Sequence, residues 1–212
     1  MTSRARPDKP PRPSALAIAV RAASHAAHRL LRLWRWCWYN VTCFVFYKPL
    51  PFSTKLMGRI RVLHRPCRLK VGARCRLGDN TFFATSLHST IELGDEVTVN
   101  RGTLIVAVDR ITIGSNTAIA EYVSFRDQTH RHGSETGVRG EGFASAPIEI
   151  GRNVWIGRGV YIGMGTKIGD NSVVGANSVV HGEFPAGVLI AGAPATIKKR
   201  LYDTDASSSP PM

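Results

Sequence analysis

The sequence predicts an all-β fold, a parallel β-helix in which three hexapeptides form one triangular coil. From residue 150 to residue 180 an aliphatic residue stands at every sixth position, and a small or β-branched residue follows it four positions later. A glycine comes directly after each of the first five aliphatic residues, where it allows the chain to turn a corner. This period fits neither a lone strand nor an α-helix, whose periods are about 2 and about 3.6 residues. The aliphatic positions are Ile150, Ile156, Ile162, Ile168, Val174 and Val180, and the glycines are Gly151, Gly157, Gly163, Gly169 and Gly175.

The repeat is less regular in the first half of the chain. Apolar residues followed by a small residue recur from Val71 onward, but the phase slips between Phe83 and Leu93 and again near Asp109. Residues 131–149 then interrupt the repeat with a charged, glycine-rich segment that has no period. A long loop that leaves a regular scaffold is usually functional, and the alternative is an insertion that the scaffold merely tolerates.

The charge of the chain is concentrated near its N-terminus. The 212 residues include 28 Lys and Arg and 15 Asp and Glu, and residues 1–76 contain 17 of the basic residues but only one acid, Asp8. Such asymmetry indicates an anionic partner such as membrane headgroups, lipid diphosphates or nucleic acid. No nucleic-acid recognition motif accompanies the basic residues, so we expect no nucleic-acid partner. The four cysteines form no CxxC pair and no Cys/His cluster with zinc spacing, which favours free thiols in a reducing cytosol.

An amphipathic helix is expected from Ser14, a candidate N-cap, to about Tyr39. Arg and His side chains fall on one side of it and Leu, Val and Trp side chains on the other, except for Trp36, which falls among the cations. Such a helix lies in a bilayer interface or caps the first coil of a solenoid, and the two roles can use different faces. We therefore expect peripheral membrane contact through residues 14–52. The expected organisation is a disordered basic tail (1–13), the helix with an aromatic segment (14–54), a linker (55–68), the β-helix domain (69–202) with the loop 131–149, and a disordered tail (203–212).

The segments NVWIGRGVYI, IGDNSVVGANSVV and AGAPATIKKR resemble the hexapeptide-repeat acyltransferases. The resemblance extends over about 69–201 and is strongest to the branch with the galactoside and maltose acetyltransferases and the polysaccharide O-acetyltransferases. It implies a left-handed β-helix, acetyl-CoA as co-substrate, no metal and a homotrimer. A short helical tail is expected around Lys198, Lys199 and Arg200.

His130 is the first candidate for a catalytic base. The hexapeptide phase predicts that Thr129 points inward and that His130 stands outward at a corner, where the long loop departs. A neutral imidazole can take the proton of an attacking hydroxyl near neutral pH. In the resembling family the catalytic histidine occupies a corresponding place, and the spacing from Asp127 to His130 matches the polysaccharide branch. His132 is the second candidate, and Asp127 either orients His130 or is a solvated turn residue.

Asn100 precedes His130 by the spacing found in the sugar acetyltransferases, where an asparagine contacts the acceptor. Its amide could orient the hydroxyl or stabilise an oxyanion, or it could be a corner asparagine. Trp155 is expected beside the acetyl end of coenzyme A. The other cofactor-binding residues that the resemblance implies are Gly157, Arg158, Ala176, His181, Gly182, Thr196 and Lys199, with Pro194 and the remaining basic residues of the tail as neighbours. His181, Gly182 and Thr196 depart from the residues usual in the family.

These observations predict an acetyl-CoA-dependent O-acetyltransferase that modifies a sugar hydroxyl in bacterial surface polysaccharide or lipid-linked glycan biosynthesis. Its expected location is the cytoplasm, at the inner face of the cytoplasmic membrane. One alternative is a soluble acetyltransferase for a free small sugar or an antibiotic. Another is a γ-carbonic-anhydrase-like metalloenzyme, with ligands drawn from His88, His130, His132 and His181. A non-enzymatic scaffold or lipid-binding module is the third.

Overall fold

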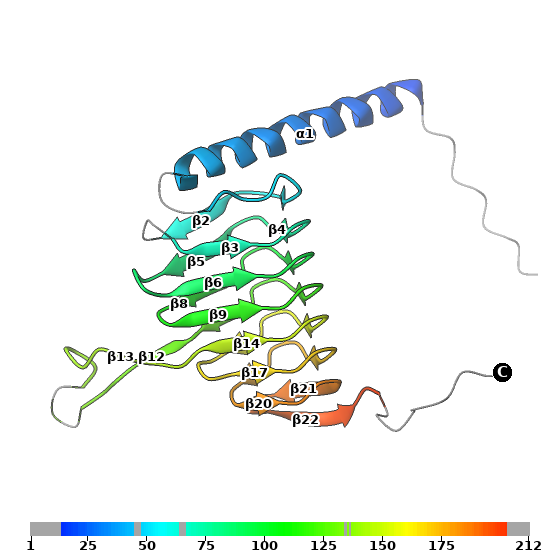
Figure 1. Ribbon diagram of the computed structural model, residues 1–212. Helices are drawn as coiled ribbons and strands as arrows, with labels where there is room; N and C mark the ends of the chain where they lie inside the picture. Colours follow the sequence, from blue (N-terminus) through cyan, green and yellow to red (C-terminus); the bar gives the residue numbers. More distant parts are fainter. Residues whose placement is uncertain (1–13, 45–47, 64–66, 134, 136, 203–212) are drawn as a thin grey trace, which may run out of the picture.

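The computed structural model describes residues 14–44, 48–63, 67–133, 135 and 137–202 of the chain. This part of the chain consists of one long helix, α1 (Ala15–Phe44), and 22 short strands, of which 20 stack into a column beneath the helix (Figure 1). The tails expected at 1–13 and 203–212 lie outside the described residues.

The strands form the three faces of a triangular column, here called face A, face B and face C. The chain adds one strand to each face in turn as it winds around the column. Face A contains β1 (Lys55–Leu56), β4 (Arg76–Leu77), β7 (Thr98–Val99), β10 (Ala118–Ile119), β15 (Trp155–Ile156), β18 (Val173–Val174), β21 (Val188–Gly192) and β22 (Ala195–Arg200). Face B contains β2 (Ile60–Leu63), β5 (Thr81–Thr85), β8 (Leu104–Ala107), β11 (Ser124–Arg126), β16 (Tyr161–Ile162) and β19 (Val179–Val180). Face C contains β3 (Leu69–Val71), β6 (Thr90–Leu93), β9 (Arg110–Ile113), β14 (Ile148–Ile150), β17 (Lys167–Ile168) and β20 (Glu183–Phe184). Two further strands, β12 (Gln128–His130) and β13 (Phe143–Ser145), form a separate antiparallel pair.

Parallel pairing sets residues one coil apart beside each other. Ile150 pairs with Ile168, and Ile162 pairs with Val180, 18 residues further along in each case. All four side chains are buried, so each coil covers the apolar surface of the next, which stabilises the stack by the hydrophobic effect. The parallel β-helix predicted from the six-residue period is confirmed.

Longer strands on face B account for the slips in the repeat. Phe83 pairs with Ile105 and Ile105 pairs with Phe125, so these two coils contain 22 and 20 residues. The additional residues lengthen β5 and β8, and they place Thr85 and Ala107 at further buried positions. The slips therefore mark wider coils within one continuous column.

The first coil starts earlier than the sequence predicts. Residues 55–68, expected to be a linker, contain β1 and β2, which pair in parallel with β4 and β5. That prediction is wrong because it depends on finding a glycine after each aliphatic residue. Leu56 is buried like the later aliphatic residues, although Met57 follows it.

A strand, and not a helix, ends the described chain. β22 runs antiparallel to β21 at the edge of face A. The chain reverses after Gly192, whose φ of 111° lies in the region that favours glycine. The predicted helical tail is therefore wrong. Its basic residues, Lys198, Lys199 and Arg200, instead lie on an exposed edge strand, where charge discourages pairing with other strands.

The C-terminal part of α1 caps the first coil. Trp36 and Tyr39 pack against the core of the column, and Nε1 of Trp36 donates a hydrogen bond to the carbonyl oxygen of Pro51 at 3.2 Å. The side-chain oxygen of Asn40 accepts a hydrogen bond from the N–H of Leu50 at 2.6 Å. Trp36 lies among the cations of the helix because this side of the helix faces the column.

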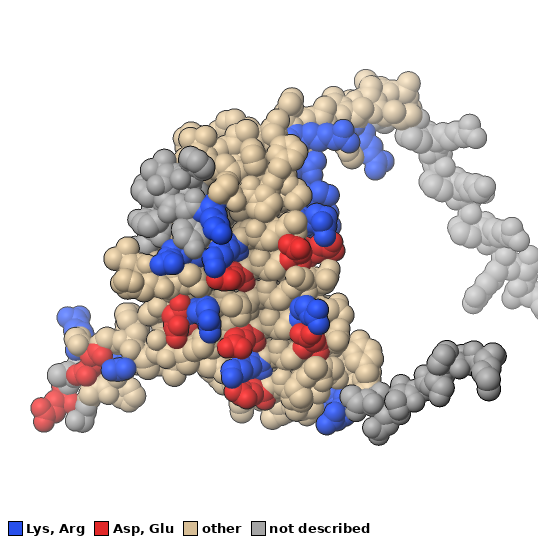
Figure 2. All heavy atoms as spheres, in the orientation of Figure 1, with Lys and Arg blue, Asp and Glu red and all other residues tan. Residues whose placement is uncertain are grey.

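The rest of α1 extends beyond the column (Figure 1). Its apolar side remains exposed, and Figure 2 shows Lys and Arg side chains gathered along the helix. No helix within the described ranges is long and apolar enough to cross a membrane. The exposed apolar side chains include Leu16, Val20, Leu30, Leu31, Trp34 and Trp38.

Candidate active site

His130 lies on an arm that leaves the column after β11. The arm consists of β12 and β13, which pair antiparallel and project away from the stacked coils (Figure 1). His130 stands opposite Phe143, and the centroids of the two rings are 4.4 Å apart. Both side chains are exposed. The arm therefore holds the imidazole outside the column, where a substrate can reach it.

The start of the arm differs from the sequence expectation. Thr129 is exposed and not inward-facing, because the chain has already left the column at this point. Asp127 takes the last inward position and is fully buried. The insertion therefore begins before His130, and the column resumes at Ile148, the first residue of β14. His130 is outward-facing, as predicted, but it lies on a strand of the arm and not at a corner of a coil.

Asp127 anchors the root of the arm. Its Oδ1 and Oδ2 accept hydrogen bonds from the backbone N–H groups of Val108 and Asp109, both at 2.8 Å. Its carbonyl oxygen accepts a hydrogen bond from the N–H of Ala146 at 3.0 Å, which joins the two ends of the arm. Burial raises the pKa of Asp127, and the two backbone hydrogen bonds oppose that rise. Asp127 is thus neither a solvated turn residue nor a direct partner of the imidazole, because its carboxylate binds the preceding coil.

Asn100 lies at the other end of face B from the arm. It follows β7 at the corner between faces A and B, where its N–H donates a hydrogen bond to the carbonyl oxygen of Ile119 at 3.0 Å. Strands β8 and β11 cross face B between this corner and the side from which the arm departs. The structure therefore does not bring Asn100 and His130 together within one chain.

The same corner contains several of the residues implied for coenzyme A. Trp155, on face A, is 58% exposed. The N–H of Gly157 donates to the carbonyl oxygen of Val174 at 2.8 Å, and a Cβ at Gly157 would lie 2.7 Å from the backbone nitrogen of Ala176. Gly157 is therefore buried beneath the next coil, and the surface at this corner belongs to Arg158 and Ala176, which are exposed.

Tyr122 and Arg101 are corner residues that the motifs do not point to. The guanidinium carbons of Arg101 and Arg158 lie 5.8 and 5.6 Å from the centroid of the Tyr122 ring, so one aromatic ring supports two cations. Tyr122 adopts a φ of 59°, which is uncommon for a bulky side chain, and Gly102 and Gly159 occupy the equivalent position in the adjacent coils. A tyrosine at a corner where the neighbouring coils have glycine is the sequence signal that could have identified Tyr122.

The remaining cofactor candidates lie nearer the last coil. His181 packs beside Tyr161 on face B, with ring centroids 5.7 Å apart, and a Cβ at Gly182 would meet only open space. Thr196 and Lys199 are exposed on β22. The eight residues implied for coenzyme A therefore lie along the last coils of faces A and B and do not close around one pocket.

The histidines are dispersed over the molecule. His88 follows β5, His130 and His132 belong to the arm, and His181 follows β19. Over the described ranges, no three His, Cys, Asp or Glu side chains gather closely enough to hold a metal ion. A metal site built from these histidines would need ligands from more than one chain.

Comparison with known proteins agrees with this architecture. The model of the family "Bacterial transferase hexapeptide (six repeats)" matches residues 147–182. The chain is 32% identical over 154 residues to WbbJ of Escherichia coli (strain K12), which is named for O-acetyl transfer in lipopolysaccharide biosynthesis; the match covers 66% of this chain and 79% of WbbJ. A maltose O-acetyltransferase from Clostridium difficile 630 is 28% identical, with a TM-score of 0.57, over 64% of this chain and 72% of that chain.

A more distant structure has the same fold. The N-acyltransferase AntD from Bacillus cereus, in complex with dTDP and 3-hydroxybutyryl-CoA, is 15% identical with a TM-score of 0.63, over 76% of this chain and 86% of that chain. The column, the arm and the sequence relationships agree with one another. The chain belongs to the bacterial hexapeptide transferase family and is an acyltransferase with the left-handed parallel β-helix of that family.

Proposed function

We propose that the protein is an acetyl-CoA-dependent O-acetyltransferase that modifies a sugar hydroxyl in bacterial surface polysaccharide or lipid-linked glycan biosynthesis. The observation that carries the proposal is the exposed imidazole of His130 on the arm. Among the described residues the His130 ring has Phe143 as a ring contact, and no hydrogen bond or ion pair occupies its nitrogens. The similarity of the chain to WbbJ and to a maltose O-acetyltransferase supports a sugar acceptor and acetyl transfer.

His130 acts as a general base in this proposal. One imidazole nitrogen takes the proton of the acceptor hydroxyl as the hydroxyl oxygen bonds to the thioester carbonyl carbon. The carbon–sulfur bond then breaks, and the leaving sulfur recovers the proton from the imidazolium. Asn100 supplies an amide that steadies the oxyanion or orients the hydroxyl. Both substrates are bound at once, so no covalent acyl-enzyme is needed.

A homotrimer completes the site. Because Asn100 and Trp155 lie away from the arm within one chain, they can meet His130 only across an interface between subunits. Coenzyme A then lies between Trp155 of one subunit and the arm of another. The exposed side chains of Arg158, Thr196 and Lys199 are available for its phosphates.

Mixing two inactive variants tests this arrangement. His130→Ala and Asn100→Ala subunits, each inactive alone, are unfolded together and refolded at equal concentration. If the site lies between subunits, mixed trimers regain one intact site each, and about a quarter of the wild-type rate returns. Variants that stay inactive after mixing would assign both residues to the same chain. An Asn100→Ala trimer with wild-type activity would remove Asn100 from the mechanism.

The helix α1 supports a place at the inner face of the cytoplasmic membrane. The side that carries the cations faces the column and packs on the first coil, and the other side presents exposed apolar and Trp side chains. That pattern favours contact between residues 14–52 and the interface of an anionic bilayer. In this proposal the acceptor is reached at the membrane surface.

The central experiment measures acetyl transfer from acetyl-CoA to a panel of sugars and detergent-solubilised lipid-linked glycans. His130→Ala is expected to lower kcat by about 10²–10⁴ and to leave coenzyme A binding intact. His132→Ala is the matched control, because His132 lies two residues further along the arm and is also exposed. Equal loss in both variants, or loss only in the control, would overturn the assignment of the base. A best acceptor that is a free small sugar or an antibiotic would favour a soluble enzyme.

A further inference from the structure

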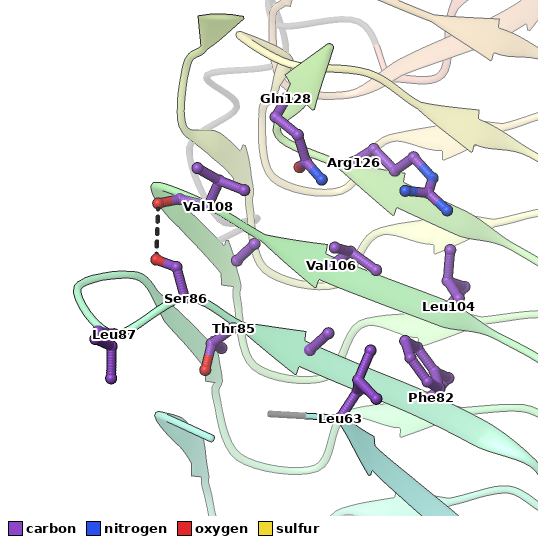
Figure 3. Close-up of a pocket in the computed structure, with 12 residues that line it drawn as sticks. Leu63, Phe82, Thr85, Ser86, Leu87, Leu104, Val106, Val108, Arg126 and Gln128 are labelled. Carbon is purple, nitrogen blue, oxygen red and sulfur yellow. Dashed lines mark hydrogen bonds between the residues drawn. The ribbon is translucent and has the colours of Figure 1, made fainter. Parts of the chain in front are cut away.

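A groove with an apolar floor runs along the outer side of face B, on the coils nearest to α1. Its volume is about 830 Å³, and Figure 3 shows the side chains that line it. The floor is formed by Phe82 and Ala84 from β5 and by Leu104 and Val106 from β8. Apolar surface of this kind binds hydrocarbon more favourably than water. The groove lies outside the coenzyme A surface described above.

The register of face B gives the groove a direction. Leu63 pairs with Ala84, Ala84 with Val106, and Val106 with Arg126, so these four side chains form one row across successive coils. The row begins at β2, in the coil that α1 caps. It ends at Arg126 on β11, directly before the arm. The lining therefore changes from hydrocarbon to cation toward His130.

The polar end of the groove has unused binding groups. Arg126 is exposed, and no acidic side chain of the described residues pairs with it. The Oε1 atom of Gln128 is buried without a hydrogen-bond partner in the described part of the chain. A buried acceptor without a donor costs free energy, so this amide favours a ligand that donates to it. Because side chains two apart on a strand share a side, Gln128 and His130 project from the same side of β12.

We propose that this groove binds the hydrocarbon chain of a lipid-linked acceptor, that Arg126 binds the phosphate or diphosphate joining lipid to sugar, and that Gln128 and His130 receive the sugar. The order of the groove, apolar floor, cation, amide and base, matches the order of such a molecule: hydrocarbon, phosphate and sugar. The inference rests on the proposed function, and it names the substrate class among those that the function allows.

The position of α1 agrees with this occupant. A second hollow, of about 500 Å³, lies between the helix and the first coil and is lined by Trp34, Trp38 and Ile60 among others. Ile60 and Leu63 are the two ends of β2, so this hollow and the groove adjoin the same strand. The exposed Arg61 lies between these two residues, so a hydrocarbon chain leaving the bilayer beside α1 would pass one cation before it reaches the row that runs from Leu63 to Arg126.

Another copy of the chain is a less suitable occupant. The cores of interfaces between subunits are depleted in charged residues, whereas here an arginine and an unpaired amide close one end of the apolar floor. Both polar groups lie within four residues of the proposed base, which is where an acceptor requires them. We therefore assign the groove to the acceptor and make contact between copies an outcome of the test.

The test is a calorimetric titration of the full-length protein with farnesyl diphosphate, which is kept below its micellar concentration. Farnesol and inorganic diphosphate are titrated separately, because the groove should bind the joined molecule more tightly than either part. Arg126→Gln removes the cation, and Val106→Trp fills the floor. The matched controls are Arg110→Gln and Thr112→Trp, which change an exposed arginine and a half-buried β-branched residue on face C.

Arg126→Gln and Val106→Trp should each weaken farnesyl diphosphate binding by about tenfold or more, with wild-type affinity in both controls. Equal affinity in all five proteins would overturn the proposal. Light scattering gives the mass of the wild type and of Val106→Trp in solution and so tests whether a second copy of the chain covers the groove. An oligomer that dissociates in Val106→Trp would assign this face to contact between copies. Acetyl transfer by the wild type to a soluble glycoside is measured in parallel. Transfer without farnesyl diphosphate binding refutes the groove alone, and binding without any transfer refutes the proposed function.

Discussion

His130 and Phe143 face each other across the two strands of the arm, with their ring centroids 4.4 Å apart and the planes inclined by 43°. The contact restrains the imidazole on one side and leaves its other side to solvent. A base on a projecting arm loses conformational freedom when it reacts, so a neighbouring ring that already restricts it lowers that cost. Phe143 is therefore a positioning residue for the proposed base.

Replacing Phe143 with alanine should lower kcat by about three- to tenfold, which is the range expected from the energy of an aromatic pair. The KM for acetyl-CoA should change less than kcat, because Arg158, Thr196 and Lys199, which are proposed to bind the phosphates of coenzyme A, lie on the column and not on the arm. Steady-state kinetics give both quantities. Phe143→Tyr keeps the ring and should restore kcat, and a variant series in which only KM moves would contradict a positioning role.

Asp127 should make the stability of the protein depend on pH. Burial raises its pKa in the folded state, so the folded protein holds this proton more tightly than the unfolded chain. The corresponding stability is complete below the unfolded pKa and is lost as the pH rises through the folded pKa. We therefore compare the free energies of unfolding of the wild type and of Asp127→Asn. The wild-type value minus the variant value should fall as the pH rises from below the ordinary pKa range of a carboxyl group.

Urea unfolding at a series of pH values measures that difference. Glu135→Gln, which removes a carboxylate from an exposed residue of the arm, is measured in the same way as the control. A difference for Asp127→Asn that grows with pH would mean that the two hydrogen bonds from Val108 and Asp109 outweigh burial.

The six-residue period could predict the column because every coil repeats the same physical requirement. Each hexapeptide needs one aliphatic side chain pointing inward, and Ile150, Ile162 and Ile168 meet it at the spacing that is typical of a parallel β-helix. The same rule fails where a coil is wider. Leu56 has no following glycine, so the glycine rule predicts a linker where β1 and β2 lie. Basic residues at Lys198–Arg200 suit an exposed helix and an edge strand equally, and only the turn at Gly192 decides for the strand.

Local motifs identified parts of the candidate site but not their arrangement. His130 could be named because it stands next to a long insertion, whereas the role of Asp127 depends on backbone groups of a coil 18 and 19 residues earlier. Arg126 and Gln128 were missed because a hexapeptide pattern gives no information on which outward side chains share a row. That information requires the register of face B.

Gly157 should tolerate a side chain less well than its equivalent one coil later. A Cβ at Gly157 would lie 2.7 Å from the backbone nitrogen of Ala176, whereas a Cβ at Gly175 would meet the Cβ of Ala191 at 3.0 Å. Backbone of a packed coil cannot move aside, but β21 lies near the end of the column and has more freedom. Gly157→Ala should lower the free energy of unfolding by about 1–3 kcal/mol, and Gly175→Ala by less. Urea unfolding compares them, and equal losses would contradict the difference in packing.

Trp34 and Trp36 should respond oppositely to replacement by alanine, because Trp36 packs on the core of the column whereas Trp34 is largely exposed. Trp36 packs on the column, donates a hydrogen bond to Pro51 and contacts the ring of Phe52 edge-on at 5.2 Å. Trp36→Ala should therefore lower the free energy of unfolding by about 2 kcal/mol. Trp34 is 59% exposed and stacks on Trp38, so Trp34→Ala should change stability by less than about 0.5 kcal/mol.

Vesicle binding should give the reverse order. Trp34→Ala removes a largely exposed indole, at the hollow beside α1, that can enter a bilayer interface, so binding to anionic vesicles should weaken by about tenfold. Trp36→Ala should bind them as the wild type does at temperatures where it remains folded. Sedimentation with vesicles and thermal unfolding measure the two effects on the same samples. Loss of stability in Trp34→Ala without loss of vesicle binding would show that the exposed side of the helix also serves the column, and the membrane role of α1 would then have no support.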